Sequence, residues 1–232
     1  MFPVGSGLDS ALDCLFPRVC VGCGRPGGFL CASCRQTVVR IEPPTCPLCG
    51  RPQSSDVLCP SCASRRPAID GIRSVFRLEG AIRHAVHELK YNNLRAIAPM
   101  LAHHLHMCLK ESGLEPDTIV PVPLHRTRER RRGYNQSFLL ARALSHDTGL
   151  PVKSQLLTRT RNTESQVGSR SARTRSLNVA GAFHCPDDAA TGTSILLIDD
   201  VCTTGATLED CARALRTAGA SRVWGLTVAR EI

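Results

Sequence analysis

The chain has 232 residues, of which 42% are hydrophobic, and carries a formal net charge of +9. This length can bury one full α/β core and one small extra module, and with no run of eighteen apolar residues nothing is expected to span a bilayer. The first ten residues lack the basic-then-apolar order of a secretory signal, so we expect a cytoplasmic protein. The positive charge either attracts polyanions such as nucleic acid or pyrophosphate, or forms a solvated surface.

Four Cys-x-x-Cys pairs dominate residues 1–66, which we expect to form a separate module. In a cytosolic chain this spacing favours metal over disulfides, and four pairs supply the ligands of two closed, structural zinc sites with four cysteines each. The segment is rich in Pro and Gly and poor in aliphatic residues, so metal must hold it together. Sequential pairing gives tandem ribbons, but a crossed arrangement, first pair with third and second with fourth, also fits the spacing. The expected ligands are Cys20, Cys23, Cys31, Cys34, Cys46, Cys49, Cys59 and Cys62.

Residues 67–232 are expected to form a second, larger domain. Alternation over residues 72–78 predicts a strand, and apolar spacing predicts helices over 80–89 and 99–109. Lys90 stands at the break between these two helices. It either presents a cation to a phosphate or is a solvated lysine at a helix end.

An arginine-rich stretch begins at the next predicted strand, residues 119–123, which ends in prolines. Arg126 is the first of five arginines that follow it. A guanidinium group can donate two parallel hydrogen bonds to the oxygens of one phosphate. The cluster therefore suits either a pyrophosphate or a DNA backbone. A helix is predicted over residues 137–145. Residues 158–183 then become polar and Arg-rich without a hydrophobic period, which predicts a working lid or a disordered linker.

Four aliphatic residues over 195–198 predict a strand that is buried on both faces, as in the interior of a parallel sheet. The strand ends on Asp199 and Asp200, whose side chains point to opposite sides of the strand, so that one of them can reach into a crevice. A Thr- and Gly-rich bend follows, in which backbone N–H groups and hydroxyls converge on a phosphate. The acid pair suits vicinal hydroxyls, and a ribose 5-phosphate needs both features. The alternative is a simple cap at the start of a helix.

A helix over residues 208–215 and an apolar strand over 223–229 complete the chain. A strand, a helix and a strand in this order predict a right-handed parallel crossover and hence a doubly wound parallel sheet. The bend has neither the lysine of a P-loop nor the glycines of a dinucleotide fingerprint.

Residues 199–207, Asp-Asp-Val-x-Thr-Thr-Gly-x-Thr, resemble the phosphoribosyl-pyrophosphate (PRPP) motif of type I phosphoribosyltransferases. The chain adds Pro-Val-Pro at 121–123, Arg-Gly-Tyr-Asn-Gln at 132–136, Thr-x-x-Gln at 163–166 and Arg-x-x-Asn-Val-x-Gly-x-Phe at 175–183. Together with the cysteine module, this pattern resembles the ComF family over almost the whole chain. It is similar also to the transferase half of glutamine amidophosphoribosyltransferases, although the N-terminal nucleophilic cysteine of those enzymes is missing.

The ComF resemblance implies a type I phosphoribosyltransferase-like α/β domain behind a double zinc ribbon. It further implies PRPP bound with Mg²⁺, and a role in natural competence with single-stranded DNA and competence-machinery proteins as partners. Asp199 and Asp200 would be the catalytic acids that serve the ribose hydroxyls. The residues that would hold the 5′-phosphate are Val201, Cys202, Thr203, Thr204, Gly205, Ala206 and Thr207. The candidates on the pyrophosphate side are Lys90, Pro123, Leu124, His125, Arg126, Arg170 and Arg175.

Three functions fit this sequence. The first is a Mg²⁺-dependent, PRPP-binding phosphoribosyltransferase-like protein associated with DNA uptake. The second is a non-catalytic adaptor, whose ribbons and arginines bind single-stranded DNA or partner proteins while the PRPP pocket is sensory or vestigial. The third is a nucleotide-salvage transferase, which explains the pocket but leaves the ribbons without a role.

Overall fold

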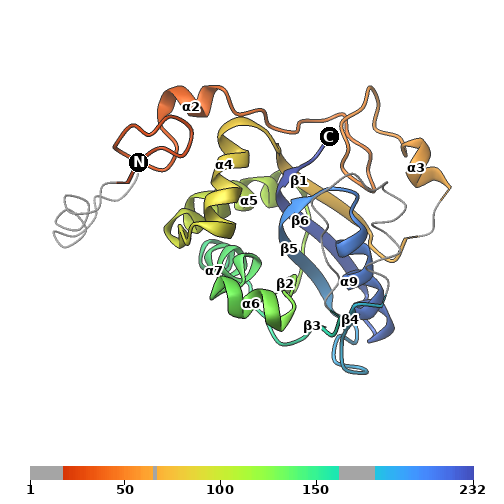
Figure 1. Cartoon of the computed structure of the whole chain (residues 1–232). Coiled ribbons are helices and arrows are strands. Elements are labelled where there is room, and N and C mark those ends of the chain that lie inside the picture. Colours follow the sequence, from red (N-terminus) through yellow and green to blue (C-terminus); the bar gives the residue numbers. More distant parts are fainter. Residues whose placement is uncertain (1–17, 65–66, 162–180) are drawn as a thin grey trace.

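The computed structural model describes residues 18–64, 67–161 and 181–232. Its helices and strands alternate along the larger domain (Figure 1). In chain order they are α2 (Ala32–Gln36), α3 (Pro60–Ala63), β1 (Gly71–Arg77), α4 (Gly80–Tyr91), η1 (Arg95–Ile97), α5 (Ala98–Ser112), β2 (Thr118–Pro121), α6 (Arg126–Arg132), α7 (Gln136–Thr148), β3 (Thr158–Arg159), β4 (Phe183–His184), β5 (Ser194–Cys202), α9 (Ala206–Thr217) and β6 (Arg222–Arg230).

Four parallel strands form the main sheet in the order β1-β6-β5-β2. Helices α4, α5 and α7 lie on one side of this sheet and α9 lies on the other (Figure 1). The expected doubly wound parallel sheet behind a cysteine-rich module is therefore confirmed. Within the described residues, no helix is both long and apolar enough to cross a membrane.

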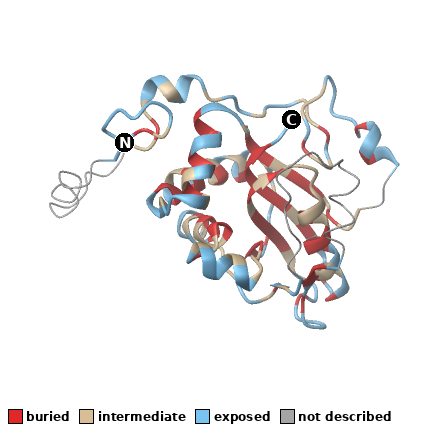
Figure 2. Cartoon of the chain, viewed as in Figure 1, coloured by how far each residue is buried: buried red, intermediate tan, exposed pale blue. Residues whose placement is uncertain are grey.

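The central strand β5 is buried on both faces, as its aliphatic run predicts. Leu196 and Ile198 belong to the core beneath α5 and α7, whereas Ile195 and Leu197 belong to the core beneath α9. All four side chains are fully buried, and each such burial contributes roughly 1.5–3 kcal/mol. Figure 2 shows the buried residues concentrated along the strands and on the helix faces that meet them. The two cores fix β5, and with it the position of the acids at its carboxyl end.

Helix α6 is not predicted by the hydrophobic pattern, because the sequence Arg126–Arg132 has no apolar residue and none of its seven residues is buried. Its ends are set locally instead. The His125 ring nitrogen accepts a hydrogen bond from the amide of Thr127, and Gly133 ends the helix in the left-handed conformation. The arginine cluster is therefore carried on a solvent-facing helical turn.

The cysteine module is hydrogen-bonded to the sheet. A strap, residues 38–41, joins the two cysteine clusters and runs antiparallel to β1 along its outer side. Ile41 donates its amide hydrogen to the carbonyl of Val75 (2.9 Å), and Arg77 donates to the carbonyl of Val39 (3.0 Å). The predicted division between residues 66 and 67 stays a prediction, since residues 65–66 lie outside the described ones.

Candidate functional site

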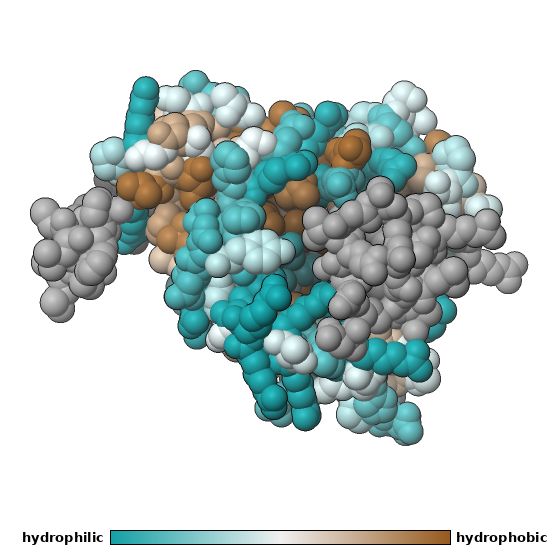
Figure 3. Space-filling view, viewed as in Figure 1, coloured by the Kyte–Doolittle hydropathy of each residue, from teal (hydrophilic) through white to brown (hydrophobic). Residues whose placement is uncertain are grey.

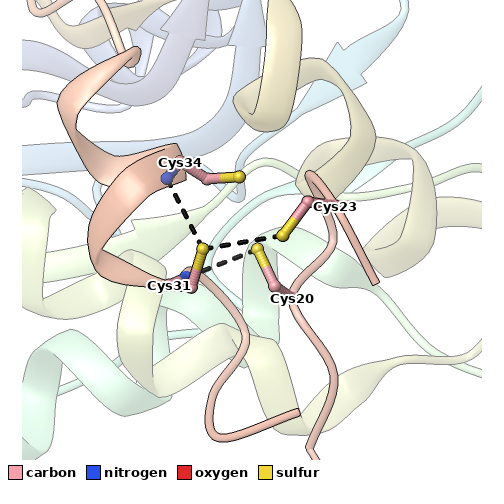
Figure 4. Close-up of side chains that lie close together, drawn as sticks. All are labelled: Cys20, Cys23, Cys31 and Cys34. Carbon is pink, nitrogen blue, oxygen red and sulfur yellow. Dashed lines mark hydrogen bonds between the residues drawn. The ribbon is translucent and has the colours of Figure 1, made fainter. Parts of the chain in front are cut away.

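The eight paired cysteines form two clusters in the sequential arrangement, and ligand sulfurs within each cluster lie within 4.8 Å of one another. Figure 4 shows the four side chains of the first cluster converging. The sulfur–sulfur distance is 3.6 Å between Cys23 and Cys31 and 3.8 Å between Cys49 and Cys59. Tetrahedral Zn²⁺ with Zn–S bonds of about 2.3 Å needs sulfurs about 3.8 Å apart. Both clusters therefore fit closed structural zinc sites. Their members are Cys20, Cys23, Cys31 and Cys34 in the first, and Cys46, Cys49, Cys59 and Cys62 in the second.

The two clusters repeat the same local geometry. The sulfur of Cys20 accepts a hydrogen bond from the amide of Cys31, and the sulfur of Cys46 accepts one from Cys59, each at 3.4 Å. Burial alone would raise the pKa of Cys20 and Cys46, but backbone N–H donors outweigh it and lower both pKa values to about 6. Backbone donors therefore favour a thiolate at the first cysteine of each cluster, whereas hydrogen bonds from neighbouring thiols raise the pKa of Cys34 and burial raises that of Cys62.

Asp200 forms a buried ion pair at the carboxyl end of β5. Its side chain is 4% exposed, and its Oδ2 lies 2.6 Å from Nζ of Lys90, which α4 supplies. Gln136 donates to the other carboxylate oxygen at 3.4 Å. Burial would raise the pKa of Asp200, but the Lys90 charge holds it below its ordinary value; the same pair raises the pKa of Lys90 against its own burial. Asp200 therefore stays ionised.

Asp199 has a different environment. Its Oδ1 accepts hydrogen bonds from the hydroxyl of Ser137 and from the amide of Asp200, both at 2.9 Å. Burial, followed by the charge of Asp200, raises the pKa of Asp199 to about 7. The adjacent acids thus have pKa values shifted in opposite directions, which is typical of carboxylates with separate chemical roles.

The bend after β5 presents backbone donors. Gly205 has φ of 83°, a conformation that strains other residues, and α9 begins directly after it. Among the described residues, no acceptor is bonded to the amides of Thr203, Thr204 and Gly205. The first turn of α9 adds further donors after Ala206, whose own amide is bonded to the hydroxyl of Thr204 at 3.3 Å, because the first turn of a helix leaves N–H groups unpaired. These groups can bind an anion.

The loop after β2 lies beside this bend because β2 pairs with β5. The amide of Val122 donates to the carbonyl of Ile198 (2.9 Å), and Asn135 donates to the carbonyl of Val122 (3.0 Å). The loop residues that follow are thereby held at the carboxyl end of the sheet. They are the predicted candidates Pro123, Leu124, His125 and Arg126.

Several residues lie near the acid pair without having been predicted there, although Arg132 belongs to the predicted arginine cluster and Arg159 to the predicted lid. Arg132 contacts Gln136 and lies 5.4 Å above the ring of Tyr91, and its charge helps to lower the pKa of Asp200. Arg159, over the ring of Phe183 at 5.2 Å, is close enough to Asp199 to interact electrostatically. Ser137 and Gln136 were also not predicted as partners of the acids. A signal was present there, because two polar residues directly before the apolar run of residues 138–141 suggest a polar contact at the start of the helix.

The ends of the predicted lid are fixed next to α9. Strands β3 and β4 pair antiparallel, and both carboxylate oxygens of Asp210 accept hydrogen bonds, from the amides of Gly181 and Ala182 at 2.9 Å. Arg170 and Arg175 lie outside the described residues, so their place on the pyrophosphate side stays a prediction.

Comparison with known proteins places the chain in a family. The family described as "Double zinc ribbon domain" matches residues 11–63. Among solved structures, the chain is similar to glutamine PRPP amidotransferase from B. subtilis (TM-score 0.42, 19% identity, 61% of this chain and 30% of that one). It is also similar to purine phosphoribosyltransferase from Pyrococcus horikoshii (TM-score 0.35, 17% identity, 57% and 82%). Both likenesses concern the fold alone.

Relatives similar over most of their length carry names connected with DNA utilization or competence. The chain is 35% identical to "DNA utilization protein YhgH" of Salmonella typhimurium, over 90% of this chain and 96% of that protein. It is 33% identical to "Competence protein ComFC" of Bacillus subtilis (89% and 86%) and 30% identical to "Competence protein F" of Haemophilus influenzae (85% and 89%). The chain therefore belongs to the ComF family, to which these relatives belong.

Proposed function

We propose that this ComF-family protein binds PRPP at the carboxyl end of β5 and acts as a phosphoribosyltransferase-like protein in DNA uptake or utilization. The names of its relatives support the role in DNA metabolism. One observation carries the choice of ligand: the acid pair is followed directly by backbone amides that no described residue satisfies. A sugar phosphate uses both, with its hydroxyls on the acids and its phosphate on the amides.

Asp199 is the better placed acid for the ribose hydroxyls. Among the described residues it is bonded to a hydroxyl and an amide, whereas Asp200 is engaged by Lys90. Lys90 marks the pyrophosphate side, where its ammonium exchanges Asp200 for a ligand phosphate. Mg²⁺ bound with PRPP beside the acid pair would offset the negative charge of the phosphates. The arginines of α6 would neutralise the departing pyrophosphate.

Calorimetric titration with PRPP, with and without Mg²⁺, tests the proposal. Asp199→Asn and Asp200→Asn should each weaken binding by at least about tenfold, the loss expected from removing one charged hydrogen bond. Asp187→Asn removes an exposed charge elsewhere and should bind as wild type does. If Asp200→Asn folds poorly, combining it with Lys90→Met removes the unpaired cation and restores folding, while binding stays weak. Wild-type affinity in both single variants contradicts the proposal.

Binding should also depend on pH through Asp199. A hydroxyl donates best to an ionised carboxylate, and Asp199 ionises near pH 7. Affinity should therefore rise by about tenfold per pH unit below that point and level off above it. The phosphates of PRPP titrate as well, with a pKa of about 6, but this titration affects binding to wild type and to Asp199→Asn equally. The ratio of wild-type to Asp199→Asn affinity isolates the carboxyl, and a ratio that does not change with pH contradicts its role.

A second candidate function rests on the surface of α6. Arg126, Arg130 and Arg131 are exposed there, and Figure 3 shows hydrophilic side chains standing out over this part of the molecule. Such a cluster suits the phosphates of single-stranded DNA. This adaptor role does not require an occupied PRPP site.

Fluorescence anisotropy with a labelled oligothymidine separates the two functions. Arg130→Ala with Arg131→Ala should weaken DNA binding and flatten its salt dependence by about two phosphate contacts. The pair Arg142→Ala with Arg222→Ala removes the same exposed charge from other elements and should have little effect. If both pairs reduce binding equally, only net charge matters and α6 is no DNA site.

A further inference from the structure

Arg230, the last residue of β6, is a buried arginine. Its side chain is among the largest fully buried ones, with 1% of the residue exposed. Its Nη1 donates to the sulfur of Cys202 at 3.0 Å, while its Nε is buried without any hydrogen-bond partner. A guanidinium in such a place is unfavourable unless an anion compensates it.

No carboxylate supplies that anion among the described residues. The ion pairs found there involve other arginines, and Arg230 takes part in none of them. Cys202 is a weak acceptor, since burial raises the pKa of its thiol and keeps it protonated. The cation therefore needs a different source of negative charge.

The second cysteine cluster lies next to this cation. A Cβ atom at Gly50, next to Cys49, would lie 2.4 Å from the carbonyl oxygen of Ile72, and one at Gly205 would lie 3.9 Å from the Cys202 sulfur that Arg230 contacts. At this separation the charge of Arg230 also acts on Cys49. When four thiolates hold one Zn²⁺, the site has a net charge of 2−. Loading the second cluster thus places a dianion beside the buried guanidinium.

A second contact leads from the same cluster to the same bend. The amide of Ile72 donates to the carbonyl of Leu48, inside the knuckle of the second cluster, at 2.7 Å. The side chain of Ile72 in turn packs against Gly205, where a Cβ atom would lie 3.0 Å from its Cδ1. The knuckle therefore supports the bend through packing as well as through charge.

We propose that the zinc-loaded second cluster is the counter-charge of Arg230, and that through Arg230 and Cys202 it holds the bend of residues 202–207 in position. Arg230 is then a positioning residue that links metal occupancy to the anion-binding bend. The first cluster has no such link among the described residues. Loss of zinc from the second cluster alone should loosen the bend.

Competition for zinc with a chromogenic chelator tests the charge contact. Cys31→Ser and Cys59→Ser each leave one complete cluster, so the rate of zinc release and the zinc affinity of each cluster can be measured separately. In the Cys31→Ser background, Arg230→Met should weaken zinc binding by about 10- to 100-fold, as loss of a neighbouring group that supports a metal site does. Arg230→Lys keeps the charge and should retain most of the affinity. In the Cys59→Ser background, Arg230→Met should change nothing.

Hydrogen exchange of peptides that cover residues 200–208 tests the link to the bend. Exchange should accelerate in Cys59→Ser and in Arg230→Met, but not in Cys31→Ser, and the first two effects should not add when combined. Cys202→Ala removes only the acceptor, so it should loosen the bend while zinc stays bound. If Arg230→Met does not fold, Arg230→Lys and Cys202→Ala provide the same comparison.

Two outcomes overturn the proposal. One is equal zinc affinity of the second cluster with Arg230 and with Arg230→Met. The other is a rate of hydrogen exchange in the bend that is the same whichever cluster is lost. Neither readout uses PRPP. A protein that fails to bind PRPP can therefore still show this coupling, and the two failures remain distinguishable.

Discussion

The two zinc ribbons share one local design but differ in their surroundings. In both, a glycine amide closes the knuckle on the carbonyl of the first cysteine at 2.8 Å, Gly24 on Cys20 and Gly50 on Cys46. In the first cluster, only Cys20 is buried; in the second, all but Cys49 are buried. Both ribbons therefore use the same knuckle and the same set of four cysteines. What the ribbon does for the rest of the protein depends on the surface it covers.

The largest expected effect comes from removing one metal site at a time. Cys46→Ser should lower the free energy of unfolding by about 3–5 kcal/mol, and the melting temperature by roughly 10 °C, because the second ribbon is hydrogen-bonded to β1. The equivalent Cys20→Ser should lower the melting temperature by only a few degrees. Thermal denaturation of both, with zinc content measured in parallel, checks the difference. Equal losses would mean that the two ribbons are equivalent.

A smaller effect is expected at the knuckle glycines. Both have positive φ, 72° at Gly24 and 69° at Gly50, so alanine costs about 1 kcal/mol at either. A Cβ at Gly24 meets nothing within 4 Å, whereas at Gly50 it would lie 2.4 Å from the carbonyl oxygen of Ile72. Gly50→Ala should therefore cost a further 1–3 kcal/mol or so. Denaturant titration measures the difference, and Gly24→Ala is the matched control for backbone strain.

The smallest predicted effect concerns acid pH on the side of the first ribbon. His104 on α5 contacts the ring of Phe76 edge-on, and burial, followed by the charges of His103, Arg40 and Arg35, lowers its pKa to about 4. The unfolded chain binds this proton near pH 6.5. The contribution of His104 to the free energy of unfolding is therefore complete above pH 6.5 and is lost as pH falls toward 4.

The loss should be about 1–2 kcal/mol, less than the full shift implies because the ring is only half-buried. Denaturation midpoints between pH 4 and 7 measure this loss in wild type and in His104→Leu, which should lack this part of the pH dependence. The control is His103→Leu, a change at the exposed neighbour, which should keep the wild-type pH dependence. An unchanged slope in His104→Leu would show that another group is responsible.

Features with a local cause could be predicted from the sequence. The buried strand β5 follows from four consecutive aliphatic residues, and the eight metal-ligand candidates follow from the Cys-x-x-Cys spacing. The spacing left the crossed pairing open, and the structure shows the sequential one. Helix α6 could not be predicted in this way, because an arginine run has no apolar face and its caps alone determine where it begins and ends.

Features that depend on distant contacts could not be predicted. Lys90 was a candidate for a phosphate, but its pairing with Asp200 joins α4 to the end of β5. Ser137 reaches Asp199 across 62 positions of the chain. An arginine that ends an apolar strand normally lies in solvent, but Arg230 is buried and donates to the sulfur of Cys202, 28 positions earlier in the chain.

The strap along β1 has a consequence for any attempt to separate the two parts of this protein. β1 is an outermost strand of the sheet, and residues 39–48 bond to the amides of Ile72 and Arg77 and to the carbonyl of Val75 along it. A fragment that starts after residue 66 would expose an unpaired row of such groups, which readily recruits other chains into continuous sheets. The isolated α/β fragment should therefore self-associate or precipitate, even where every residue of the phosphate site is present.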